Sequence, residues 1–181
     1  IHQTTSYVFR DTDHAAALYN MELGGHLYTR ISNPTVAVLE QRVAALDGGV
    51  AATATASGMA ALTTAVMTIC SSGDHIVASS RMYGANINLL ENTLPRFGIT
   101  TSFVAPDNVD AIRAAIQPNT KIIFGEVIGN PGLDVMDVEA VAAAARAAHV
   151  PLMPAVQFNT PWLLKPVSLV ANIPLHSLPQ R

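Results

Sequence analysis

The sequence has little charge and almost no cysteine or tryptophan. Among its 181 residues 13% are charged, the net charge is -3, and there is one cysteine and one tryptophan. A chain without a basic excess lacks the charge pattern of a nucleic-acid-binding protein, so we expect no nucleic-acid partner. Its one cysteine, Cys70, cannot form a disulfide within the chain, which favours a reducing, cytoplasmic setting.

Long hydrophobic runs and metal-ligand motifs are also missing. No stretch approaches the roughly 20 apolar residues of a membrane span, so we expect no membrane partner. The opening IHQTTSYVFRD has no basic region followed by an apolar block and therefore does not resemble a signal peptide. The six histidines show no HxxxH or HxH spacing, so we expect no metal site.

Short apolar runs alternate with helical patterns along most of the chain, of which 50% is apolar. This alternation predicts an α/β fold with three layers, a mostly parallel sheet flanked by helices. The last thirty residues contain six prolines and no clean period, so we expect an irregular segment there. The patterns predict strands over 50–54, 75–80, 99–104, 120–127 and 150–154, and helices over 33–49, 57–70, 85–97, 107–116 and 137–149.

The helix predicted over 33–49 has recognisable start and stop signals. Asn33 is a good N-cap residue, Pro34 suits the first turn, and Gly48 lies just past the end. Its apolar residues recur at helical spacing, at Val36, Leu39, Val43 and Leu46.

The stretch TASGMAAL, residues 55–62, raises the question of what Gly58 makes room for. Between a strand and a helix, Gly58 and Met59 would present unpaired backbone N–H groups at a helix N-terminus. Such amides bind phosphate, and a glycine lets the anion approach. Alternatively, small residues here only let the helix pack on the sheet, because the pattern is neither a Walker nor a Rossmann motif.

An aromatic residue and a basic residue, Tyr28 and Arg30, occur close together in YTRISNPT, residues 28–35. In an extended chain Tyr28 and Arg30 would lie on the same face, since they are two residues apart. An arginine fork and a phenol suit a phosphate or a carboxylate. A surface arginine beside a packing tyrosine is the other interpretation.

Tyr83 and Asn130 follow two of the predicted strands, at the edge of the sheet where α/β proteins bind ligands. A tyrosine there can stack on a planar ring or simply pack. Asn130 precedes Pro131, which favours an extended backbone. Its amide could bond a ligand oxygen or form an Asx turn.

Taken together, these motifs resemble the Cys/Met-metabolism family of pyridoxal-phosphate enzymes, and within it the O-acetylhomoserine sulfhydrylases. The resemblance covers about residues 2–152, in a nearly continuous series of motifs in the right order. They are HQTTSYVFRDTDHAAAL, YTRISNPTVAVLEQRVAALDGG, TASGMAAL, GDHIVASSRMYG, TLPRFGI, GNPGLDV and EAVAAAARAAHVPL.

The resemblance implies roles for individual residues around pyridoxal 5'-phosphate. In such enzymes the amides matching Gly58 and Met59 bind the cofactor phosphate, and Ser177 matches a cofactor-binding serine. A tyrosine matching Tyr83 stacks on the pyridine ring and assists proton transfer as a catalytic residue. An asparagine like Asn130 lies near the ring hydroxyl.

The resemblance also implies a fold and an assembly. The fold is the large domain of fold-type I, here expected without a separate C-terminal domain. Residues 1–34 would form an N-terminal arm and cofactor-contacting loop, and residues 35–181 the cofactor-binding domain. Residues matching Tyr28 and Arg30 reach the phosphate of a neighbouring subunit, so we expect a homo-oligomer, a dimer or tetramer, that acts on an amino-acid substrate.

The chain departs from the family pattern at its end. Ala155 stands where the family has an aspartate that pairs with the pyridine nitrogen. Gln180 stands at the lysine that forms the Schiff base, and Pro179 at a phosphate-binding threonine. A glutamine cannot form an imine, so covalent cofactor attachment is not expected at this position.

The resemblance predicts an enzyme of the sulfhydrylase type that replaces the acetate of O-acetylhomoserine with sulfide to give homocysteine. Cystathionine γ-synthase is an alternative within the family. Methionine γ-lyase is disfavoured because Ala85 follows the Tyr83–Gly84 pair where those enzymes have a cysteine. The departures at Ala155 and Gln180 support a different class, a non-catalytic remnant of the fold that acts as a binding or assembly module.

Overall fold

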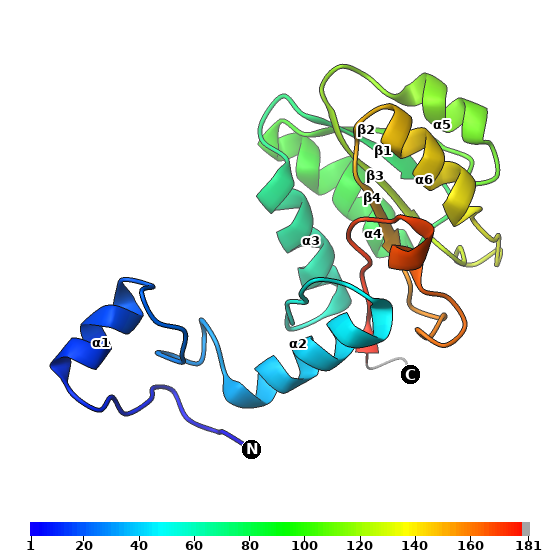
Figure 1. Ribbon diagram of the computed structural model, residues 1–181. Helices are drawn as coiled ribbons and strands as arrows, with labels where there is room; N and C mark the ends of the chain where they lie inside the picture. Colours follow the sequence, from blue (N-terminus) through cyan, green and yellow to red (C-terminus); the bar gives the residue numbers. More distant parts are fainter. Residues whose placement is uncertain (179–181) are drawn as a thin grey trace. The chain divides into compact units, whose positions relative to one another are not determined.

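The computed structural model describes residues 1–178 and divides the chain into two compact units (Figure 1). The first unit contains residues 1–45 and 49–54, and the second contains residues 46–48 and those from 55 onward. The sequence predicts a different division, by function, into a cofactor-contacting arm (1–34) and a cofactor-binding domain (35–181). That functional division stays a prediction.

The first unit contains helix α1 and most of helix α2. Helix α1, Thr12–Tyr19, was not predicted, although Asp11 caps it by accepting a bond from the His14 amide. Helix α2, Pro34–Asp47, begins as the sequence predicts, because Asn33 Oδ1 accepts the Thr35 amide at 2.8 Å. Gly48 then turns the chain with φ +76°, so the predicted start and stop signals are confirmed.

The prediction of a strand over residues 50–54 is wrong. This segment forms no strand, Val50 is fully exposed, and the Ala54 amide donates to Glu40 Oε1 at 2.8 Å. An apolar run becomes a strand only when a neighbouring strand pairs with it, and all four strands of the sheet come from the second unit. Gly58 therefore follows an irregular segment.

The second unit is built on a parallel sheet of four strands. These are β1 (His75–Ser79), β2 (Thr100–Val104), β3 (Thr120–Glu126) and β4 (Leu152–Ala155), in the order β2-β1-β3-β4. Every neighbouring pair in this sheet is parallel. The predicted α/β fold with a mostly parallel sheet is thereby confirmed, since helices cover both faces.

Each face of the sheet has its own hydrophobic core (Figure 1). On one face the core includes residues from α3 (Gly58–Ile69) and from the helical run that begins with α4 (Gly84–Asn88). On the other it includes residues from α5 (Val109–Ala115) and α6 (Val138–Ala147). Typical members of the first core are Leu62, Val66, Leu90 and Phe124, and of the second Val77, Ile112, Val141 and Leu152.

The helix predicted over residues 85–97 forms, but in three different geometries. After α4 comes a π-helix, η1 (Leu89–Thr93), and then a 3₁₀-helix, η2 (Leu94–Phe97). Pro95 has no amide hydrogen and cannot donate to the preceding turn, so a regular α-helix cannot continue through it. Gly98, at φ +76°, ends the run.

The proline-rich end of the described chain is mostly irregular, as the sequence predicts. It includes the 3₁₀-helix η3 (Pro166–Leu169). Leu175 forms a parallel bridge with Ala155, which brings the segment back beside the end of β4. None of the helices formed by residues 1–178 is both long enough and apolar enough to cross a bilayer.

Candidate functional site

The carboxyl ends of two adjacent strands, β1 and β3, lead into the loops that carry two of the predicted site residues. Strands β1 and β3 end at Ser79 and Glu126, and the loops that follow contain Tyr83 and Asn130. The Tyr83 amide donates to Glu126 Oε1 at 2.9 Å, so the structure brings the Tyr83 loop against the end of β3. The side chain of Tyr83 remains half exposed, and Asn130 is exposed.

The structure also brings Gly58 together with Ser177. A Cβ added at Gly58 would lie 3.1 Å from Ser177 Cβ and 3.2 Å from Ser177 Oγ. Ser57 caps α3 by accepting the Ala60 amide at 3.1 Å, whereas the first amides of an α-helix have no partner inside the helix. Gly58 thus makes room for the Ser177 side chain beside the start of α3.

A buried pair that sequence reasoning missed fixes the residue before Ser177. His176 Nε2 bonds Asp47 Oδ2, and the two side chains are 8% and 4% exposed. The partners are 129 residues apart in the sequence, so no local pattern indicates the contact. The pair ties the end of the described chain to residues 46–48 of the same unit.

Glu126 is the second residue that sequence reasoning missed. It is 2% exposed, and its Oε1 accepts from Asn86 Nδ2 at 2.8 Å as well as from the Tyr83 amide. Burial raises the pKa of the Glu126 carboxyl, against the lowering effects of these two donors and of the Asn130 backbone. Glu126 ends the strand TKIIFGE, and the hydrophobic residues around it give no separate sequence signal for a buried acid beside Tyr83.

Tyr28 and Arg30 lie in the first unit and contact each other. The guanidinium carbon of Arg30 is 5.5 Å from the centroid of the Tyr28 ring, a cation–π arrangement. The chain here is not extended but turns, because the amides of Ile31 and Ser32 both donate to the Tyr28 carbonyl. Their action on a phosphate of another subunit stays a prediction.

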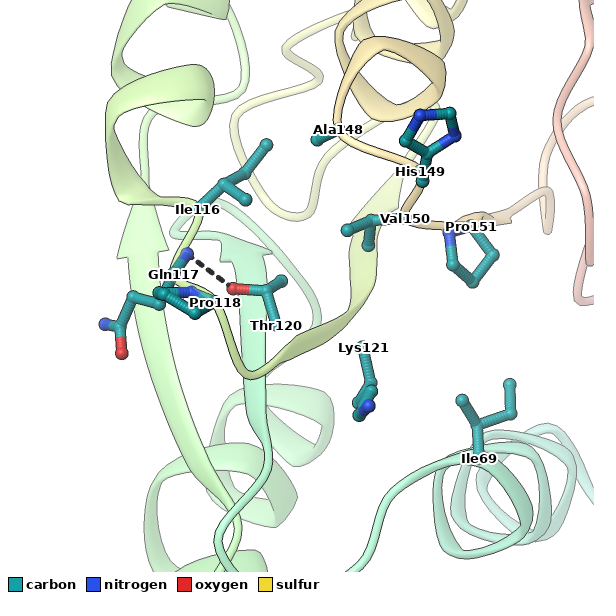
Figure 2. Close-up of a pocket in the computed structure, with 10 residues that line it drawn as sticks. All are labelled: Ile69, Ile116, Gln117, Pro118, Thr120, Lys121, Ala148, His149, Val150 and Pro151. Atoms are coloured by element: carbon teal, nitrogen blue, oxygen red, sulfur yellow. Dashed lines mark hydrogen bonds between the residues drawn. The ribbon is translucent and has the colours of Figure 1, made fainter.

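A separate cavity of about 690 Å³ lies at the opposite edge of the sheet (Figure 2). Its walls include Thr120 and Lys121 at the start of β3, and Pro151 just before β4. The Gln117 amide closes one wall by donating to Thr120 Oγ1 at 2.7 Å. This cavity contains none of the predicted site residues, so the candidate site is the carboxyl edge.

A family model for Cys/Met metabolism PLP-dependent enzymes matches residues 1–180. The chain belongs to this family. It is 47% identical over 178 residues to an O-acetyl-L-homoserine sulfhydrylase of Leptospira meyeri, covering 98% of this chain and 40% of the relative. It is also 47% identical over 178 residues to a homocysteine synthase of Schizosaccharomyces pombe, covering 98% of this chain and 42% of that protein.

A solved structure supports the same assignment of the fold. A Campylobacter jejuni protein described as an O-acetylhomoserine (thiol)-lyase, solved with N'-pyridoxyl-lysine-5'-monophosphate, superposes with a TM-score of 0.95 at 37% identity. The match covers 98% of this chain and 44% of that one. The fold is therefore that of fold-type I PLP-dependent enzymes, and the chain spans less than half the length of these relatives.

The residues of this Cys/Met metabolism chain fit the phosphate group of pyridoxal phosphate better than its pyridine nitrogen. The Gly58 backbone and the Ser177 hydroxyl lie together at the start of α3, and this cradle of helix amides and a hydroxyl suits a phosphate. At the position expected to face the pyridine nitrogen, Ala155 offers only a methyl group, buried at 4% exposure. Gln180, at the expected Schiff-base position, lies outside the described residues.

Proposed function

We propose that this chain forms the cofactor-binding part of a PLP-dependent enzyme of the O-acetylhomoserine sulfhydrylase type, which replaces the acetate of O-acetylhomoserine with sulfide to give homocysteine. The observation that carries the proposal is the contact of Gly58 with Ser177 at the start of α3. Two residues far apart in the sequence meet there, and they form a phosphate cradle beside the carboxyl edge of the sheet. The sulfhydrylase names of the relatives support this choice of reaction.

Each predicted site residue has a role in this proposal. The amides of Gly58 and Met59 and the Ser177 hydroxyl bind the phosphate. Tyr83 lies against the ring and moves a proton, and Asn130 bonds the ring hydroxyl. In a homo-oligomer, Tyr28 and Arg30 add positive charge and a phenol to the phosphate of a neighbouring subunit. When bound, pyridoxal phosphate supplies the electron sink for chemistry at the amino-acid carbons.

The departures at the end of the chain favour a second candidate, a protein that keeps the fold and the phosphate cradle without catalysis. Ala155 is part of the hydrophobic core on the α3 face and offers no acid to a ring nitrogen. The Gln180 amide is not an amine nucleophile, so this chain would hold the cofactor without a covalent bond. The enzyme and the non-catalytic protein would both bind phosphate at Gly58 and Ser177, but only the enzyme would convert O-acetylhomoserine.

Cofactor titration with borohydride trapping tests the proposal. Pyridoxal 5'-phosphate should give a saturable absorbance change. Gly58→Val should weaken that binding by about tenfold or more, because its side chain would push Ser177 away from the start of α3. Gly24→Val is the matched control, since nothing lies within 4 Å of a Cβ at Gly24. Equal affinity in the two variants would remove the cradle from the proposed function.

Borohydride trapping tests the expected absence of a lysine adduct, and a turnover assay separates the two candidates. Reduction should leave the cradle without a lysine adduct in this chain, because its two lysines, Lys121 and Lys165, lie outside the predicted site. Turnover of O-acetylhomoserine with sulfide supports the enzyme, and binding without turnover supports the module. Comparing sulfide, cysteine and methionine separates sulfhydrylase, cystathionine γ-synthase and methionine γ-lyase activity, and exclusive methionine cleavage would contradict the sulfhydrylase assignment.

A further inference from the structure

Glu126, the last residue of β3, has a buried carboxyl group for which the proposed function has no use. At 2% exposure it lies on the same face of the sheet as Ile122 and Phe124, since alternate residues of a strand share a face. A carboxyl group removed from water in this way costs free energy unless it makes hydrogen bonds. Its partners therefore indicate what the group is for.

Two hydrogen-bond donors to Glu126 belong to the loop and helix that carry the predicted ring-stacking tyrosine. Oε1 accepts from the Tyr83 amide at 2.9 Å and from Asn86 Nδ2 at 2.8 Å. Tyr83 is the N-cap residue of α4, and its own amide finds its acceptor in Glu126 at the end of strand β3. These bonds fix the main chain at Tyr83 and leave its phenol ring free for another contact.

The Tyr83 loop is held from a second side by the loop that follows β3. Arg81 Nη1 lies 2.7 Å from Asp134 Oδ1, and the Arg81 amide donates to Ser79 Oγ at 3.1 Å. A Cβ at Gly129 would come within 2.7 Å of the Arg81 carbonyl oxygen, so only a glycine lets the two loops approach this closely. Glu126 lies at the root of the loop that also contains Asn130.

We propose that Glu126 is a positioning residue, whose buried carboxyl group fixes the Tyr83 main chain so that the tyrosine ring can lie against the pyridine ring of the cofactor. The ring contact rests on the proposed function, whereas the effect on the Tyr83 main chain does not. Because only Oε1 accepts these two bonds, a glutamine can replace the acid in this role. A leucine of similar volume removes the acceptor and cannot.

The test compares Glu126→Leu and Glu126→Gln, with Glu91→Leu as the matched control, an exposed glutamate in the same helical run. Glu126→Leu should weaken pyridoxal 5'-phosphate binding by about tenfold or more and leave inorganic phosphate binding unchanged. Glu126→Gln and the control should bind both within about threefold of the unsubstituted chain. Glu126→Asp, whose shorter side chain cannot reach the Tyr83 amide, replaces the leucine variant if that variant fails to fold.

Amide hydrogen exchange at Tyr83 provides the readout that does not depend on the cofactor. Exchange should speed up by about tenfold or more in Glu126→Leu and return close to the original rate in Glu126→Gln. Unchanged Tyr83 exchange, or equal loss of cofactor and phosphate binding in Glu126→Leu, would overturn the inference. If the unsubstituted chain binds no pyridoxal phosphate, the proposed function fails, and the exchange result alone decides the role of Glu126.

Discussion

His75, at the start of β1, is a polar side chain inside the core with a hydrogen bond at each ring nitrogen. Nδ1 lies 2.8 Å from Thr120 Oγ1, Nε2 lies 2.9 Å from Ser102 Oγ, and the residue is 1% exposed. Burial lowers the pKa of His75 from its ordinary value of 6.5. The folded protein therefore favours the neutral form of the His75 ring.

The lowered pKa predicts a loss of stability in mild acid. The unfolded chain binds a proton at His75 as the pH falls through 6.5, while the folded chain resists it until the lower pKa is reached, so the free energy of unfolding decreases over that interval. Urea unfolding at several pH values should show this slope, and His75→Gln should reduce it. The exposed His2→Gln is the control, and an equal reduction in both variants would contradict the assignment.

At the residue scale the sequence indicates the site only in part. Gly58 stands out because a glycine precedes an apolar helix, and Tyr83 because it follows a strand. Glu126 gives no such signal, since a glutamate in a hydrophobic strand can also mark an exposed edge. The contacts of Gly58 with Ser177 and of Asp47 with His176 join distant parts of the chain, and only the folded structure shows them.

Among helices and strands, the sequence predicts the buried segments well, but it does not show which apolar run lacks a partner strand. The strands β1 to β4 form where short apolar runs lie between helices, because each run finds a parallel neighbour. The run 50–54 is also short and largely apolar but has no partner strand, so its local pattern alone predicts a strand that does not form. The run 85–97 kept its helical character, but Pro95 changed the type of helix, an effect of one missing amide.

At the scale of the whole molecule, helix α2 leaves apolar side chains exposed at helical spacing. Val36, Leu39 and Leu46 are 39%, 42% and 56% exposed. Large apolar side chains repeated along one stripe of a helix are typical of an interaction surface, and the proposed homo-oligomer would cover them with a second copy. This surface adds to the expected contribution of Tyr28 and Arg30 to a neighbouring subunit.

Light scattering at micromolar concentration should therefore find a dimer or a larger assembly. Leu39→Glu should shift the assembly toward monomer, because it introduces a charge into the apolar stripe. Gln41→Glu adds the same charge at an exposed position on another face of α2 and should leave the assembly unchanged. A clean monomer for the unsubstituted chain would refute the proposed oligomer.

In the proposed function, the second unit binds the phosphate of pyridoxal 5'-phosphate between the start of α3 and Ser177. Phosphorus NMR titration tests it most directly, with Ser177→Ala compared with Ser168→Ala, an exposed serine in the same terminal segment. Loss of a hydrogen bond to a charged group should weaken binding by about tenfold in Ser177→Ala. Ser168→Ala should retain the affinity and bound phosphorus shift of the unsubstituted chain, whereas equal affinity in all three proteins would contradict the claim.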